Sequence, residues 1–90
     1  MTPSELLAKP ENWTKGSYAR DANGLPTELF GPSAVSFCLI GALKKCCVLD
    51  EETILNSLIT ARGFWSVADF NDRPNTTHDH VLSVLKEARL

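Results

Sequence analysis

The stretch AVSFCLIGALKKCCVL, residues 34–49, decides how this chain folds. Apolar or small side chains fill nearly every position before Lys44, so no polar face is left for solvent. A helix that is apolar all round is buried, whereas a surface helix carries a single apolar stripe. We therefore expect residues 34–49 to form a central helix with the other elements packed around it.

Small residues recur within this stretch, at Ala34, Cys38, Gly41 and Ala42. Positions three or four apart lie on one face of a helix, so they predict a face that another helix or a ribbon approaches closely. A leucine at Gly41 or Ala42 would overpack that contact, at a cost of about 1–3 kcal/mol.

The segment after the central stretch, residues 50–63, carries the clearest helix signals. Asp50 is the expected N-cap, and Gly63 follows the last turn as a stop signal. The expected inner stripe consists of Ile54, Leu55, Leu58 and Ala61.

Three shorter segments complete the helical pattern. A first helix near residues 2–9 has Thr2 or Ser4 as its cap. Residues 64–72 predict a short helix or turn, because Pro74 prevents a smooth continuation. A last helix is expected from about residue 77 to residue 89, with Val81, Val84 or Leu85, and Ala88 pointing inward.

A small ribbon is expected between the first helix and the central stretch. Asn23-Gly24 is a strong signal for a tight hairpin turn, and its arms would be Ser17–Asp21 and Leu25–Thr27. The predicted fold class is therefore mainly α. It is a single globular domain over residues 1–90, with four to five helices around a buried central helix and a short N-terminal β-hairpin-like ribbon.

The composition of the chain predicts its class, its partners and its compartment. With 43% apolar and 22% charged residues, the chain predicts a small soluble domain and not a disordered one. Its nine Lys and Arg residues are scattered, so we expect no nucleic-acid partner. No apolar run is long enough to span a bilayer, and the N-terminus does not predict a secretory signal. The three cysteines favour reduced thiols in a cytoplasmic protein, and the small size makes a homodimer a reasonable expectation.

Residues 68–81, ADFNDRPNTTHDHV, contain both histidines of the chain. His78 and His80 stand two apart and point away from each other on a helix, whereas zinc-binding histidines on one helix stand three or four apart. Thr77 and His80, or Thr76 and Asp79, instead have the spacing of a capping box. We favour capping and predict neither a metal nor a cofactor.

The same stretch ends one helix and begins another. Asn71 is expected to close the preceding helix in a left-handed conformation, and Asp72 to accept backbone N–H bonds in the turn before Pro74. The cysteines do not predict a nucleophile, since Cys46 and Cys47 stand at the C-terminal end of their helix, where the dipole raises a thiol pKa.

The pattern of short blocks W..G.YARD..G, A.SFC..GAL, FND and V...L..A resembles that of an uncharacterised bacterial and phage family, domain of unknown function 6197. The resemblance runs from about residue 13 to residue 88 and implies a small helical domain without a known activity. After the FND block the chain inserts RPNTTHDH in place of a plain cap. The positions that match the pattern are Trp13, Gly16, Ala19, Arg20, Asp21, Gly24, Cys38, Gly41, Ala42, Leu43, Asn71 and Asp72.

The resemblance suggests that the Trp13–Asp21 segment and the Asn71-Asp72 turn belong together. We expect Arg20 or Asp21 to meet Asn71 or Asp72 across the fold, beside Trp13. The candidate polar site consists of Trp13, Tyr18, Arg20, Asp21, Asn71, Asp72 and His78, with no catalytic residue assigned.

Two functions follow from these observations. The first is a binding or regulatory module, encoded by a phage or an accessory genome, that acts on an unidentified protein partner. The alternative is a small ligand-binding domain or enzyme that uses the candidate polar site. The first is favoured because no catalytic motif stands out in the sequence.

Overall fold

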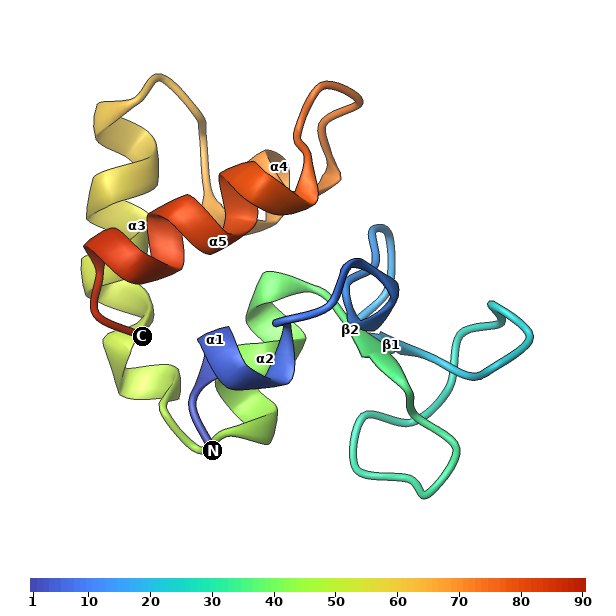
Figure 1. The fold of residues 1–90 in the computed structure, drawn as a ribbon. Coiled ribbons are helices and arrows are strands. Elements are labelled where there is room, and N and C mark those ends of the chain that lie inside the picture. The colour runs from blue at the N-terminus through green and yellow to red at the C-terminus, as the bar shows by residue number, and fades with distance from the viewer.

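The central apolar stretch forms both a strand and a helix in the computed structural model, which describes residues 1–90 apart from the side chain of Leu49. The described chain contains five α-helices, two short strands and two 3-10 turns (Figure 1). The helices are α1 (Pro3–Leu6), α2 (Leu39–Lys45), α3 (Glu52–Ala61), α4 (Val67–Asp72) and α5 (His78–Glu87). The strands are β1 (Ala19–Arg20) and β2 (Ser36–Phe37), and the 3-10 turns are η1 (Pro10–Asn12) and η2 (Leu49–Glu51). The predicted mainly α fold with an N-terminal ribbon is confirmed.

The central helix begins later than the sequence predicted. Cys38 is its N-cap, and the Cys38 thiol accepts a hydrogen bond from the Gly41 amide. The preceding Ser36 and Phe37 form β2, which is buried. The boundary was wrong because a continuous apolar run looks the same whether it is a buried strand or a buried helix.

The prediction of a closely approached face on the central helix is confirmed at Gly41. A Cβ atom there would lie 2.2 Å from the carbonyl oxygen of Tyr18. Ala42 is completely buried, whereas Ala34 precedes β2 and lies outside the helix. The backbone beside β1 therefore packs directly on the first turn of α2.

The ribbon has a different partner from the one expected. β1 pairs with β2 in antiparallel fashion, with Ala19 opposite Phe37 and Arg20 opposite Ser36. The predicted arm Leu25–Thr27 contributes one isolated bridge, between Arg20 and Pro26. The turn itself is present, because Gly24 has φ of 80° and the Asp21 amide donates to the Leu25 carbonyl. The hairpin prediction was thus wrong for the second arm.

The inner face of α3 also differs from the prediction. Leu55 and Ile59 are completely buried, whereas Ile54 is 52% exposed and Ala61 is exposed. Leu58 is half-buried. Residues 55 and 59 are four apart on one face, and Ile59 was missed because the adjacent apolar pairs Ile54-Leu55 and Leu58-Ile59 allow more than one stripe. The helix follows the η2 turn, and its N-cap Glu51 makes no side-chain capping bond, so the predicted Asp50 cap was wrong.

The last two helices start at the positions that capping chemistry requires. Ser66 caps α4 through a bond from the Asp69 amide. Thr77 caps α5, and Thr77 and His80 form the reciprocal capping box that their spacing predicted. Val81, Val84 and Leu85 are completely buried, as expected.

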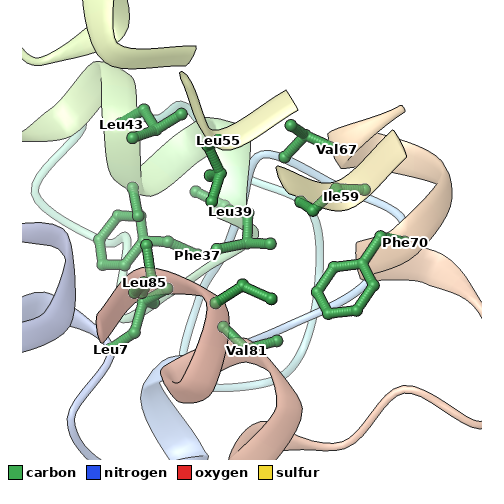
Figure 2. Close-up of a cluster of buried hydrophobic side chains, with 13 residues drawn as sticks. Leu7, Phe37, Leu39, Leu43, Leu55, Ile59, Val67, Phe70, Val81 and Leu85 are labelled. Atoms are coloured by element: carbon green, nitrogen blue, oxygen red, sulfur yellow. The ribbon is translucent and has the colours of Figure 1, made fainter. Parts of the chain in front are cut away.

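One core joins all the elements. Figure 2 shows side chains of β2, α2, α3, α4 and α5 converging with Leu7, which follows α1. The two ends of the chain lie close together, since the Ser4 amide donates to the Leu90 carbonyl. In contrast, the loops over residues 21–35 project from the ribbon (Figure 1), and only part of them, including Leu29 and Ala34, packs against the core. No described helix has the length and apolar character needed to cross a membrane.

Candidate functional site

Asn71 is the centre of the polar cluster. It lies in the last turn of α4, directly after the buried Phe70, and is only 1% exposed. Its Oδ1 accepts from the indole N–H of Trp13 at 2.7 Å and from the Leu39 amide at 3.0 Å. Its Nδ2 donates to the Thr14 carbonyl at 3.1 Å and to Asp72 Oδ1 at 2.9 Å. Every hydrogen-bonding position of this side chain is therefore occupied.

The role expected for Asn71 in the helix end was wrong. Asn71 is helical and does not have a positive φ, so it does not close α4 in a left-handed conformation. Its side chain can satisfy four partners because α4 stops beside the start of α2 and the Trp13–Thr14 segment. A local sequence pattern cannot reveal that arrangement, since three of these partners lie 32, 57 and 58 residues away.

Asp72 extends the cluster toward the surface. Its Oδ1 also accepts from the Gly16 amide at 3.0 Å, where Gly16 has φ of 78°. Lys15 forms a second link between the same two segments, because its ammonium group donates to the Arg73 carbonyl at 2.6 Å. The expectation that Asp72 accepts amides of its own turn was therefore wrong, and the carboxylate instead holds a loop 56 residues earlier in the chain.

The predicted link between the two segments is present, but through different residues. The segment meets Asn71 and Asp72 through Trp13, Thr14 and Gly16. Among the described side chains, Arg20 and Asp21 form no bond with Asn71 or Asp72, so the expected direct contact was wrong.

Arg20 and Asp21 instead order their own loop. The Arg20 guanidinium donates to the carbonyls of Lys15 and Gly24. The Asp21 carboxylate accepts from the amides of Asn23 and Leu25. Arg20 thus fixes the backbone next to Gly16, whereas Asp21 fixes the turn at Asn23-Gly24.

His78 lies near Trp13 but serves a different contact. Its Nε2 donates to the Leu7 carbonyl at 2.6 Å, and its ring centroid is 6.4 Å from that of Trp13. His80 is occupied in the cap of α5. Across the described residues, no three His, Cys, Asp or Glu side chains are grouped so that they could hold a metal ion.

A cleft of about 380 Å³ opens beside the cluster. It lies between the Gly16–Tyr18 segment, the start of α2 and the outer side of α4. Its lining consists of Gly16, Ser17, Tyr18, Cys38, Ile40, Ala68, Asn71 and Asp72. The bonds of Asn71 and Asp72 hold these walls together, so the cleft exists without a ligand.

The Cys38 thiol in this cleft is not an activated nucleophile. Burial raises the pKa of the thiol above its ordinary value, and the sulfur accepts the Gly41 amide bond. A raised pKa leaves the thiol protonated at neutral pH, and the thiolate is the nucleophilic form. Cys38 therefore contributes a capping atom and part of the apolar wall.

Tyr18 forms the exposed rim of the cleft. The residue is 54% exposed, and the Lys44 ammonium lies 4.4 Å from the centroid of its ring. Ser17, Ile40 and Ala68 also line the cleft, and the sequence had not singled them out. They carry no motif of their own, because only the packing of α4 against the loop and α2 makes them neighbours.

Comparison with known proteins gives one finding. No curated protein and no solved structure matches the chain. A family model described as a family of unknown function, DUF6197, matches residues 4–89. This match covers nearly the whole chain and includes every block on which the resemblance rested. The chain therefore belongs to DUF6197, a family of unknown function.

Proposed function

We propose that this protein is a non-catalytic binding module that acts through protein–protein interaction, and that its recognition surface is the cleft beside Asn71 with the adjoining ribbon loops. The observation that carries the proposal is the distribution of exposed apolar side chains. Four of the seven large apolar residues that are strongly exposed lie between residues 18 and 35, namely Tyr18, Leu25, Phe30 and Val35. Exposed apolar groups that gather in one region are typical of interaction surfaces.

The architecture of the cleft supports this role. Asn71 and Asp72 tie the walls of the cleft together through four hydrogen bonds to two other segments, the Trp13–Gly16 segment and the start of α2. A surface that is already ordered loses little conformational entropy on binding. Tyr18 at the rim adds an aromatic ring, a residue type that is enriched in protein interfaces.

Catalysis is less well supported by the same geometry. Asn71 has no free hydrogen-bonding position, and the Cys38 thiol is protonated and bonded to the helix backbone. The alternative of a small-ligand site is favoured by one observation. The volume of the cleft, about 380 Å³, lies within the range of about 300–1,000 Å³ that is typical of small-molecule pockets.

Affinity capture from a lysate of the native host, followed by quantitative mass spectrometry, tests the proposal. Three baits are compared: the wild type, Ala68→Trp and Ala61→Trp. Ala68 lines the cleft and is exposed, so tryptophan would fill the cleft without removing a core side chain. Ala61 is exposed on α3 and does not line the cleft, so it provides a matched control.

The proposal predicts a partner that the wild type and Ala61→Trp capture equally and that Ala68→Trp loses. Thermal unfolding of the three baits would show that all are folded. Equal capture by all three baits would contradict the cleft as the recognition surface. A small molecule that co-purifies with the wild type alone would favour the ligand-binding alternative.

A further inference from the structure

The charge of the residues that line the cleft indicates which chemical class of ligand fits it. Of the eight lining residues, Asp72 alone carries a charge at neutral pH, because the Cys38 thiol is protonated. The ion pairs among the described side chains are Arg62–Glu87 and Arg73–Asp69. Asp72 therefore has no cationic partner within the described part of the chain. Its Oδ1 accepts two bonds, while Oδ2 accepts none from the described residues.

Several hydrogen-bond donors around the cleft are already used. The Gly16 amide donates to Asp72, and the amides of Leu39 and Gly41 donate to Asn71 and Cys38. Both N–H groups of the Asn71 amide are donated as well. The side-chain amide of Asn71 has no free donor, and Asp72 keeps a free carboxylate oxygen, so a cation that donates hydrogen bonds fits the site better than an anion.

The nearby cations do not neutralise Asp72. Lys15 donates to the Arg73 carbonyl, and its ammonium lies 5.4 Å from the centroid of the Trp13 ring. Arg73 pairs with Asp69 at 3.0 Å. Lys44 lies over the ring of Tyr18. Each is held by another group, so the free carboxylate oxygen of Asp72 remains available to a ligand.

The other walls of the cleft are apolar. Ile40 is half-buried at the start of α2, Ala68 is exposed on α4, and both line the cleft. An aliphatic chain could lie between these two side chains and reach Asp72 at its end. Long basic side chains have this character, because they bury a methylene stem on apolar surface and keep a charged head among polar groups.

We infer that the cleft takes an arginine or lysine side chain of a protein partner, with its aliphatic stem against Ile40 and Ala68 and its cationic head on Asp72. This inference rests on the proposed protein-binding function. A protein is favoured over a free amine because Tyr18 at the rim of the cleft and the apolar residues Leu25 and Phe30, in the loops that follow β1, are exposed, so a partner could cover more than the cleft itself.

A titration of the ¹⁵N-labelled protein, followed by NMR, tests the inference directly. The probes are two capped tripeptides, acetyl-Gly-Arg-Gly-amide and acetyl-Gly-Lys-Gly-amide, and the neutral analogue with citrulline in place of arginine. We expect saturable shifts of the amides of Gly16, Ile40, Ala68 and Asp72 with the basic peptides. The citrulline peptide should bind at least about tenfold more weakly, because it lacks the charge that strengthens the bond to a carboxylate.

The variant Asp72→Asn keeps an oxygen for Gly16 and Asn71 and removes the charge. It should weaken binding of the basic peptides about tenfold, whereas Asp79→Asn, an exposed aspartate on α5, should leave binding unchanged. Equal binding of the arginine and citrulline peptides, shifts outside the cleft, or no binding at millimolar peptide would overturn the inference. Free agmatine that binds far more tightly than either peptide would also overturn it, in favour of a small amine.

The capture experiment separates this inference from the proposed function. If Ala68→Trp loses the partner and Asp72→Asn keeps it, the proposed protein-binding function is supported. The inference that the cleft takes a basic side chain is then wrong. If Ala68→Trp keeps the partner, the proposed function itself fails.

Discussion

The side chain of Asn71 connects three parts of the chain that local sequence would keep apart. Its Oδ1 accepts hydrogen bonds from the Trp13 indole and the Leu39 amide, and its Nδ2 donates to the Thr14 carbonyl and to Asp72 Oδ1. An unpaired buried donor costs about 1–3 kcal/mol, so the loss of this one side chain affects several groups at once.

Asn71→Ala should therefore lower the free energy of unfolding by about 3 kcal/mol, because the Trp13 indole and the Leu39 amide lose their acceptor. Urea unfolding followed by circular dichroism would measure the loss. Asn75→Ala, an exposed asparagine four positions later, is the matched control and should change stability little. A loss below about 1 kcal/mol for Asn71→Ala would contradict the role given to this residue.

The three thiols should differ in reactivity. Cys38 is buried and Cys46 is half-buried, and burial raises the pKa of both thiols, whereas Cys47 is exposed. At pH 7.5 a thiol-specific reagent should modify Cys47 first and Cys38 only as fast as the protein unfolds. Peptide mapping by mass spectrometry would assign each site, with Cys47→Ser as the control that removes the fast phase. Rapid modification of Cys38 in the folded protein would contradict its buried position.

At the scale of the elements, the contact between β1 and α2 positions the cleft. Gly41 lets the helix approach so closely that its missing Cβ would lie 2.2 Å from the Tyr18 carbonyl. That carbonyl also accepts the Cys38 amide. The rim residue Tyr18 and the wall residue Cys38 are thus fixed by the same contact.

Gly41→Ala should destabilise the fold by about 1–3 kcal/mol, since backbone must move to accommodate the methyl group. In an open helix the same change would stabilise by about 1 kcal/mol, because alanine is the better helix former. Thermal unfolding therefore distinguishes the two cases. A lower unfolding temperature would indicate a close contact at Gly41, and a higher one would indicate open space. Ser83→Ala on the exposed side of α5 is a control for the introduction of alanine into a helix.

We expect the free energy of unfolding to depend on pH through Asp69, in the first turn of α4. The Asp69 carboxylate accepts from the Arg73 side chain and from the Trp65 amide, and these bonds lower its pKa. A lowered pKa stabilises the folded state above the unfolded value of about 3.9, and the effect is lost as pH falls through the folded value. Asp69→Asn should therefore reduce the free energy of unfolding more at pH 6 than at pH 3. In an Arg73→Gln background this difference should shrink, and an unchanged difference would show that the pair does not cause it.

At the scale of the whole molecule, the helices and the loops differ in burial. The core cluster draws on α2, α3, α4, α5, both strands and Leu7, which follows α1. Within residues 21–35, which the structure describes in full, no side chain is buried. The proposed recognition surface is therefore placed on the least buried part of the fold, while the cleft is held by the core.

Hydrogen exchange should reflect this division. Amides of α2 and α5 should exchange only through global unfolding, whereas those of residues 22–34 should exchange faster, because few buried contacts oppose local opening. Mass spectrometry of peptic peptides would measure both rates, and a bound partner should slow the loops. Uniform exchange over the whole chain would contradict the division.

The sequence by itself determined the helical character of the chain, the turn at Asn23-Gly24 and the family. It also offered Thr2 as one of two caps for α1, and Thr77 with His80 as one of two capping boxes for α5, and these are the caps that the structure has. Each follows from neighbouring residues: a capping box spans four positions, and a tight turn spans two between its arms. The association of the Trp13 segment with Asn71 followed from the order of blocks in the family, but the bonding residues did not.

Only the tertiary structure decided what depends on distant partners. It divided the apolar stretch into β2 and α2, because pairing with β1 requires a strand where periodicity allows a helix. It gave Asn71 its four bonds and brought Ile40 and Ala68 into the lining of one cleft. The physical reason is that these contacts join residues about 20–60 positions apart, and their geometry is set by packing of the whole core, which no local pattern encodes.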